Sequence, residues 1–130
     1  MPDYRDVYAH HAGRYDLLVS HEDHEGNLAR ALGELLPRAP FDVVETGAGT
    51  GRVTRLLAPF AHRIDAFDAE AAMIEVARRT LQGAAHVHFG VATHDALPLA
   101  DASADLGVEG WAFGHAVSWN AAGWRDDVRR

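Results

Sequence analysis

The feature that most constrains this chain is residues 41–51, an apolar run followed at once by alternating glycines. Its first part, 41–46, contains the β-branched and aromatic residues of a buried parallel strand. The glycines that follow are Gly47, Gly49 and Gly51. Residues 51–60 then carry the pattern of a helix. The stretch therefore predicts a strand, a glycine-rich turn and the start of a helix in direct succession.

Alternating glycines at this position are typical of a nucleotide-binding loop. Glycine adopts positive φ and, because it lacks a Cβ, lets a ligand approach the backbone, while the first turn of a helix offers unpaired N–H groups. A tight strand-to-helix turn without a ligand would use the same residues. Three alternating glycines directly after an apolar strand favour the binding loop.

The spacing of the glycines separates two cofactor classes. The dinucleotide pattern G-x-G-x-x-G reserves its last position for glycine, whereas here Arg52 stands there and the third glycine comes one position early. Glu45 precedes the loop by two positions, and a carboxylate is a poor neighbour for a pyrophosphate but a good one for an ammonium or sulfonium group. A dinucleotide oxidoreductase is therefore disfavoured.

Residues 45–51, Glu-Thr-Gly-Ala-Gly-Thr-Gly, resemble the first motif, [D/E]-x-G-x-G-x-G, of the class I S-adenosylmethionine-dependent methyltransferases. The resemblance implies an α/β, Rossmann-like fold of three layers (αβα), with a truncated, mostly parallel sheet of strand order 3-2-1-4 preceded by N-terminal helices. It also implies S-adenosyl-L-methionine as the cofactor, S-adenosyl-L-homocysteine as the product and a small-molecule acceptor.

The composition of the chain limits its number of domains, its partners and its location. With 130 residues, 48% of them hydrophobic, the chain has the size of one domain, which we divide into an N-terminal helical cap (1–38) and a Rossmann-like core (39–130). The formal net charge of −7 argues against a nucleic-acid partner. No cysteine is available for a disulfide or thiolate metal site, and no apolar run has membrane-spanning length or the form of a signal peptide. We expect a cytoplasmic protein with neither nucleic-acid nor membrane partners.

A second strand is predicted over 61–68, and it closes on Asp68. An acidic residue at the end of the strand after a glycine loop is placed to accept both ribose hydroxyls of an adenosine. The helix expected over 69–79 offers another explanation, since an acidic residue also suits a helix N-terminus. This segment resembles the second motif of the family, which adds Ala69 and Met73 to the implied cofactor site, with Met73 near the adenine face.

Residues 3–20 fit an amphipathic helix that Gly13 weakens. The stripe at helical spacing consists of Tyr4, Tyr8, His11, Tyr15 and Leu18. Packing alone would explain each tyrosine. Many small methyltransferases, however, open with a Tyr-rich helix that ends in Tyr-Asp and covers the methionine end of the cofactor. Tyr15-Asp16 matches that ending, so the resemblance places Tyr15 in the cofactor site.

The segment 21–25 contains His21 and His24 together with carboxylates. Such a cluster can hold a divalent metal ion. Acidic residues near the positive end of a following helix explain the same segment, and histidine pairs three apart without a third placed ligand often arise by chance. We predict no metal site. The helix that follows carries leucines at 28, 32, 35 and 36 and stops before Pro37.

A third strand is predicted over 85–91. The segment 93–105 then resembles the family's run Asp-Ala-x-x-Leu-Pro-x-x-Asp-x-Ser-Phe-Asp, although it is one residue shorter before Leu-Pro and has Ala104 in place of the phenylalanine. In the family, the first aspartate accepts from the adenine amino group and the next N–H faces the ring. The resemblance assigns these roles to Asp95 and Ala96.

A fourth strand is predicted over 105–111, with Glu109 and Gly110 at its carboxyl end, across the crevice from the glycine loop. Family members continue into a fifth strand and a hairpin, which this chain lacks, so the fourth strand would be an open apolar edge. A miniature enzyme paired with a second copy, a piece of a longer protein, and one subunit of a split enzyme each explain this. We expect a homodimer through that edge and the C-terminal segment.

Methyl transfer from a sulfonium requires alignment of the nucleophile and, where needed, removal of its proton, so the cofactor motifs name no catalytic residue. The candidate bases near the expected mouth of the site are His115, His11 and His10. The predicted function is an S-adenosylmethionine-dependent methyltransferase. The alternative is a non-catalytic adenosyl-binding module or a subunit of a split methyltransferase. The predicted cofactor residues are Tyr15, Glu45, Gly47, Ala48, Gly49, Asp68, Ala69, Met73, Asp95, Ala96, Glu109 and Gly110.

Overall fold

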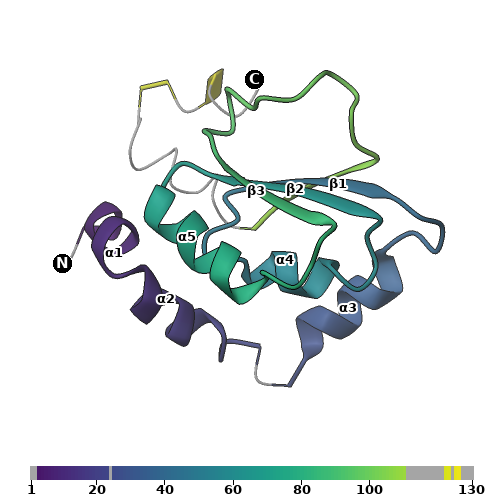
Figure 1. The fold of residues 1–130 in the computed structure, drawn as a ribbon, viewed down its shortest axis with the longest axis horizontal. Coiled ribbons are helices and arrows are strands. Elements are labelled where there is room, and N and C mark those ends of the chain that lie inside the picture. The colour runs from purple at the N-terminus through teal and green to yellow at the C-terminus, as the bar shows by residue number, and fades with distance from the viewer. Residues whose placement is uncertain (1–2, 24, 111–121, 124, 127–130) are drawn as a thin grey trace.

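The structure is a computed structural model that describes residues 3–23, 25–110, 122–123 and 125–126. Its centre is a sheet of four parallel strands in the order β3-β2-β1-β4 (Figure 1). The strands are β1 (Asp42–Thr46), β2 (Arg63–Asp68), β3 (Val87–Val91) and β4 (Leu106–Glu109). The predicted α/β fold and strand order are confirmed.

Helices cover one face of this sheet. The helices are α1 (Tyr4–His10), α2 (Ala12–Val19), α3 (Asn27–Leu35), α4 (Arg52–Leu57) and α5 (Ala71–Thr80). Figure 1 shows α3, α4 and α5 on one side of the strands, and the chain between β3 and β4 on the other side.

The hydrophobic core lies between the sheet and this helical layer. Leu57 of α4 and Ile64 of β2 are fully buried, and Phe41 and Val43 pack in the same cluster. Full burial of such side chains contributes about 1.5–3 kcal/mol each. Leu32 of α3 packs against the cluster from outside, so α3, α4 and the sheet form one unit.

Asp105 attaches the last described strand to the first. Its carboxylate Oδ2 accepts the Asp42 N–H at 2.8 Å, and its own N–H donates to the Asp42 carbonyl oxygen at 2.9 Å. The same aspartate closes the segment that resembles a family motif. It therefore fixes the start of β4 beside β1.

The N-terminal helical region differs from the single stripe that its spacing predicts. The helix breaks at His11, between α1 and α2, rather than at Gly13. The two ends of the stripe are exposed, Tyr4 at 59% and Leu18 at 66%, whereas Tyr8 and Tyr15 stay in ring contact across the break. The buried residue near the end of α2 is Val19 instead. Both helices pack against α5.

Residues 21–25 lie between two helices. The His21 ring nitrogen Nδ1 is 2.8 Å from the Leu17 carbonyl oxygen at the end of α2. The Asp23 carboxylate accepts the backbone N–H groups of Leu28 and Ala29 and so caps α3. His24 lies outside the described residues. The segment therefore serves the helix ends, and no group of three potential metal ligands occurs in the described part of the chain.

Among the residues that the structure describes, no helix has both the length and the apolar character needed to cross a membrane.

Candidate cofactor-binding site

The carboxyl ends of β1 and β2 lie side by side and carry the glycine loop. Thr46 is in register with Phe67, and the Ala48 N–H donates to the Phe67 carbonyl oxygen at 2.9 Å. The loop glycines have φ values of 63° at Gly47, 57° at Gly49 and 86° at Gly51. All three occupy the left-handed region that a residue with a Cβ rarely adopts, so the turn depends on these glycines.

Asp68 joins the second strand to this loop. Its Oδ2 accepts the Gly49 N–H at 2.9 Å, and its Oδ1 accepts the Glu70 N–H at 2.9 Å. A carboxylate oxygen can accept more than one hydrogen bond. Asp68, half-buried at the strand tip, therefore combines a structural role with the geometry expected of a ribose acceptor.

Glu45 lies under the loop and is 1% exposed. The Thr54 hydroxyl of α4 donates to its Oε2 at 2.6 Å. Burial raises the pKa of Glu45 to about 7; the Thr54 hydrogen bond opposes this rise and the Asp68 charge adds to it. A buried carboxyl that titrates near neutrality is ionised more readily when a cation comes near.

Tyr15 and Met73 converge on Gly49. A Cβ at position 49 would lie 3.3 Å from the Met73 methyl group and 4.0 Å from the Tyr15 ring. The glycine therefore leaves room for a contact between the loop backbone and two side chains from α5 and α2. This contact places two of the predicted cofactor residues against the loop.

Three tyrosines form a row that leads away from the loop. Ring centroids are 5.2 Å apart for Tyr8 and Tyr15, in an edge-to-face arrangement, and 6.1 Å apart for Tyr4 and Tyr8. Burial raises the pKa of Tyr8 to about 12, and the charges of Tyr15, Tyr4 and Asp68 add to this. Burial also raises the pKa of Tyr15. Both phenols are therefore neutral donors at physiological pH, close to the Asp68 carboxylate.

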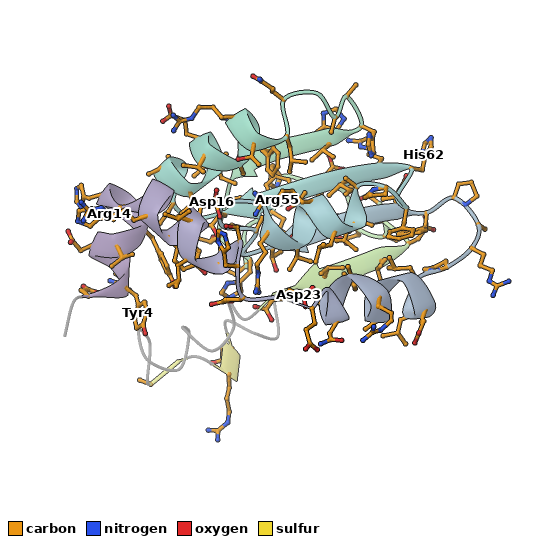
Figure 2. The ribbon with its side chains drawn as sticks, turned by 90° about the horizontal axis from the view of Figure 1, so that it is seen from below. Tyr4, Arg14, Asp16, Asp23, Arg55 and His62 are labelled. Carbon is orange, nitrogen blue, oxygen red and sulfur yellow. The ribbon has the colours of Figure 1, made fainter. Side chains whose placement is uncertain are left out.

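Two ion pairs connect this N-terminal region to α4, the helix that follows the glycine loop. Arg52 Nη1 lies 2.8 Å from Glu22 Oε2, and Arg55 Nη2 lies 3.4 Å from Asp16 Oδ1. Figure 2 shows Asp16 and Arg55 side by side. We call α1, α2 and the turn to Glu22 the cover. The sequence analysis missed these pairs; its only hint was that Asp16 follows Tyr15 directly.

Other predicted cofactor residues lie around the strand tips. Ala48 packs in the core, and its N–H donates to the Phe67 carbonyl oxygen. Its own carbonyl oxygen accepts the Gly51 N–H, so Ala48 helps to shape the loop. Ala69 is exposed next to Asp68. Their place in a ligand site stays a prediction.

Glu109 and Gly110 end the fourth strand beside the loop. Glu109 is in register with Thr46, immediately before Gly47, as expected. A Cβ on Gly110 would lie 3.3 Å from a methyl group of Val53 in α4, so this glycine lets β4 approach the loop helix closely.

Asp95 and Ala96 lie in the segment after β3. The Ala92 N–H donates to the Asp68 carbonyl oxygen at 3.0 Å, which brings the start of this segment to the tip of β2. Asp95 and Ala96 are both exposed, and the Ala96 N–H donates to the Thr93 carbonyl oxygen at 3.2 Å. Their proposed adenine contacts stay a prediction.

The structure singles out no catalytic base among the candidate histidines. His10 is exposed and its Nδ1 is 2.9 Å from the Asp6 carboxylate on the same helix. Asp6 and His10 are two residues away from the tyrosine positions and so project from another side of α1. His11 is exposed at the helix break, and His115 lies outside the described residues.

A parallel sheet of this order, a glycine loop after β1 and a carboxylate closing β2 are the features expected of the class I S-adenosylmethionine-dependent methyltransferases, which share them with Rossmann dinucleotide-binding folds. Comparison with known proteins agrees. The sequence matches the methyltransferase domain family over residues 43–125, and the chain belongs to this family.

Its relatives are longer proteins. The chain is 36% identical over 104 residues to the ubiquinone/menaquinone biosynthesis C-methyltransferase UbiE of Rubrivivax gelatinosus, and the match covers 78% of this chain and 41% of that protein. The chain therefore spans about two fifths of the length of that curated relative.

Solved structures give the same assignment. The DhpI–SAM–HEP complex matches with a TM-score of 0.73 and 25% identity, covering 97% of this chain and 57% of that chain. The YcgJ protein of Bacillus subtilis matches with a TM-score of 0.66 and 28% identity, covering 82% of this chain and 46% of that chain.

Proposed function

We propose that this chain binds S-adenosyl-L-methionine and takes part in transfer of its methyl group to a small-molecule acceptor. The observation that carries the proposal is the bond between the Asp68 carboxylate and the Gly49 N–H, which unites the ribose acceptor and the glycine loop at one point. Family membership and the SAM- and SAH-bound DhpI structures support the choice of cofactor.

The geometry suits such a ligand at each part of the site. A Cβ at position 49 would meet Met73 and Tyr15, so glycine lets these two predicted cofactor residues lie against the loop backbone. In the proposal Asp68 holds the ribose, Gly47 and Gly49 lie along the methionine end under Tyr15, and Asp95 reaches the adenine.

When bound, the cofactor supplies an electrophilic methyl group on a sulfonium, and transfer is an in-line displacement. The residues of this chain bind and orient. Asp68 and the loop fix the adenosyl position, Tyr15 shields it from water, and the Glu45 carboxyl favours a nearby positive charge as its proton leaves. We assign no base, and we further propose a homodimer and a cytoplasmic location.

Calorimetry tests the cofactor assignment. We expect binding of S-adenosylmethionine and S-adenosylhomocysteine but not of NAD, and loss of more than about tenfold in affinity in Asp68→Ala, because both the ribose acceptor and the loop contact disappear. The matched control is Asp65→Ala, which removes a β2 carboxylate paired with Arg63 on the same strand, three residues before the tip. Unchanged binding in Asp68→Ala, or equal losses in both variants, would overturn the assignment.

A methyl-release assay over panels of small acceptors then separates an enzyme from a binding module. Turnover with any acceptor supports the methyltransferase. Cofactor binding without turnover on any acceptor of the panels would favour the non-catalytic alternative.

A further inference from the structure

We propose that Arg52 and Arg55 are positioning residues that hold Tyr15 over the glycine loop, so that two ion pairs, Arg52–Glu22 and Arg55–Asp16, form a clasp controlling retention of the ligand. This inference rests on the proposed cofactor site, because Tyr15 matters for retention only if a ligand lies beneath it.

Both ion pairs of the clasp use carboxylates that follow Tyr15 closely in the chain. Asp16 is the residue after Tyr15, so the Arg55 pair fixes the backbone of α2 at the point from which the ring projects. Glu22 lies at the far end of the turn that follows α2, and its partner Arg52 begins α4 directly after the last loop glycine. The two arginines are therefore anchored in the helix that the loop itself opens.

Side chains, rather than a packed interface, make this connection. The strongest helix contacts of α2 are with α5 and α1; towards α4, Arg55 pairs with Asp16 of α2, and Arg52 pairs with Glu22 in the turn after α2. The side chains of Arg52 and Glu22 are 17% and 50% exposed, and those of Arg55 and Asp16 are 27% and 23% exposed, so the Arg55 pair is the less screened of the two. Opening both pairs would leave α2 packed on α5 and α1, with the Tyr15 ring as its contact with the loop.

The charges of one pair also act on the Tyr15 hydroxyl. Burial is the largest cause of the raised pKa of Tyr15, the Arg52 charge lowers this pKa, and the Glu22 charge raises it. Both partners of the pair therefore influence the phenol electrostatically. The state of the clasp is therefore reported by the titration of Tyr15 itself.

Binding kinetics test the role of the clasp. With S-adenosylhomocysteine as the probe, which carries no net charge at neutral pH, we expect Arg55→Met to weaken affinity about two- to fivefold, mostly through faster dissociation, and Arg52→Met to do the same. Salt near 1 M should weaken wild-type binding by a similar factor and leave the double variant nearly unchanged.

The control is Arg79→Met, which removes an arginine of the same charge from an exposed pair with Glu75 on α5. It should change neither the affinity nor its salt dependence. The exchanged variant, Asp16→Arg with Arg55→Asp, should recover most of the affinity lost in Arg55→Met, and thermal melting identifies any variant that fails to fold. Wild-type affinity in both clasp variants would overturn the proposal.

Tyrosinate absorbance during an alkaline titration gives a readout that requires no ligand. Relative to the wild type, Arg52→Met should move the Tyr15 transition to higher pH and Glu22→Gln to lower pH, with Tyr15→Phe identifying the transition. If neither variant moves it, the pair does not face Tyr15 and the clasp is refuted. If the shifts appear but wild-type protein binds no S-adenosylhomocysteine, the clasp geometry stands and the proposed function fails.

Discussion

In the glycine loop, Gly47, Gly49 and Gly51 hold positive φ values, and backbone N–H groups bond to the tip of β2. In the cover, α1 and α2 reach the same point through ring contacts and two ion pairs. One half of the site is thus built from backbone geometry and the other from side chains. Backbone geometry of this kind is rarely adopted by a residue with a Cβ, whereas side-chain contacts can loosen one at a time.

This difference determines how the two halves respond to mutation. Changes in the loop should affect folding and binding together, because the turn that carries the site also joins β1 to α4. Changes in the cover should affect binding more than folding, because no residue of α1 or α2 belongs to the main core cluster, which consists of six buried residues between positions 41 and 66 and the hydrophobic side chains packed against them.

The largest effect is expected for Gly49→Val. Its φ of 57° is strained for a β-branched residue, and a Cβ there lies 3.3 Å from the Met73 methyl group. Met73 can shift its flexible end, so the backbone strain dominates. We expect a loss of roughly 2–4 kcal/mol in the free energy of unfolding, measured by urea denaturation, and no detectable binding of S-adenosylhomocysteine.

Gly83→Val is the matched control. Gly83 lies in the turn after α5, is not among the positive-φ glycines, and has open space around its Cβ position. It should lose little stability and bind normally. If Gly49→Val binds as well as Gly83→Val, the loop is only a turn and the backbone half of the comparison is wrong.

The sequence predicts the loop half of the site better than the cover half. The glycine loop and Asp68 were predictable because local residue types indicate positive φ and an acid at a strand end. The strand order was predicted from the family resemblance. The two ion pairs were not, since they join residues 30 and 39 positions apart and depend on how α2 lies against α4. The helix break at His11 was also missed, because periodicity continues through it in the sequence.

The second effect concerns Glu45, on the loop side. The folded-state pKa of about 7 lies above the ordinary value of 4.5, so the native state holds a proton that the unfolded chain has already released. The stabilisation from this proton is complete below about pH 4.5 and is lost as pH rises to about 7. The wild type should lose on the order of 3 kcal/mol of stability over this window.

Glu45→Gln removes this titration while keeping an oxygen for the Thr54 hydroxyl. The urea midpoint of the wild type should therefore fall between pH 4.5 and 7, and that of Glu45→Gln should fall less, because the variant lacks the Glu45 titration. Binding of S-adenosylmethionine, the cation, should weaken more than that of S-adenosylhomocysteine. If the midpoints of the wild type and Glu45→Gln change with pH in the same way, the raised pKa and the burial of Glu45 under the loop are wrong.

The smallest effect belongs to the cover, where Tyr8 supports Tyr15 through an edge-to-face contact with centroids 5.2 Å apart. Tyr8→Leu keeps apolar volume but removes the ring, a contact worth about 0.5–1.5 kcal/mol, so affinity for S-adenosylhomocysteine should fall about two- to tenfold with little change in melting temperature. Tyr8→Phe keeps the ring and should bind like the wild type. If the leucine variant instead loses stability and affinity together, the cover is part of the folding unit, and the contrast between backbone-built and side-chain-built halves does not hold.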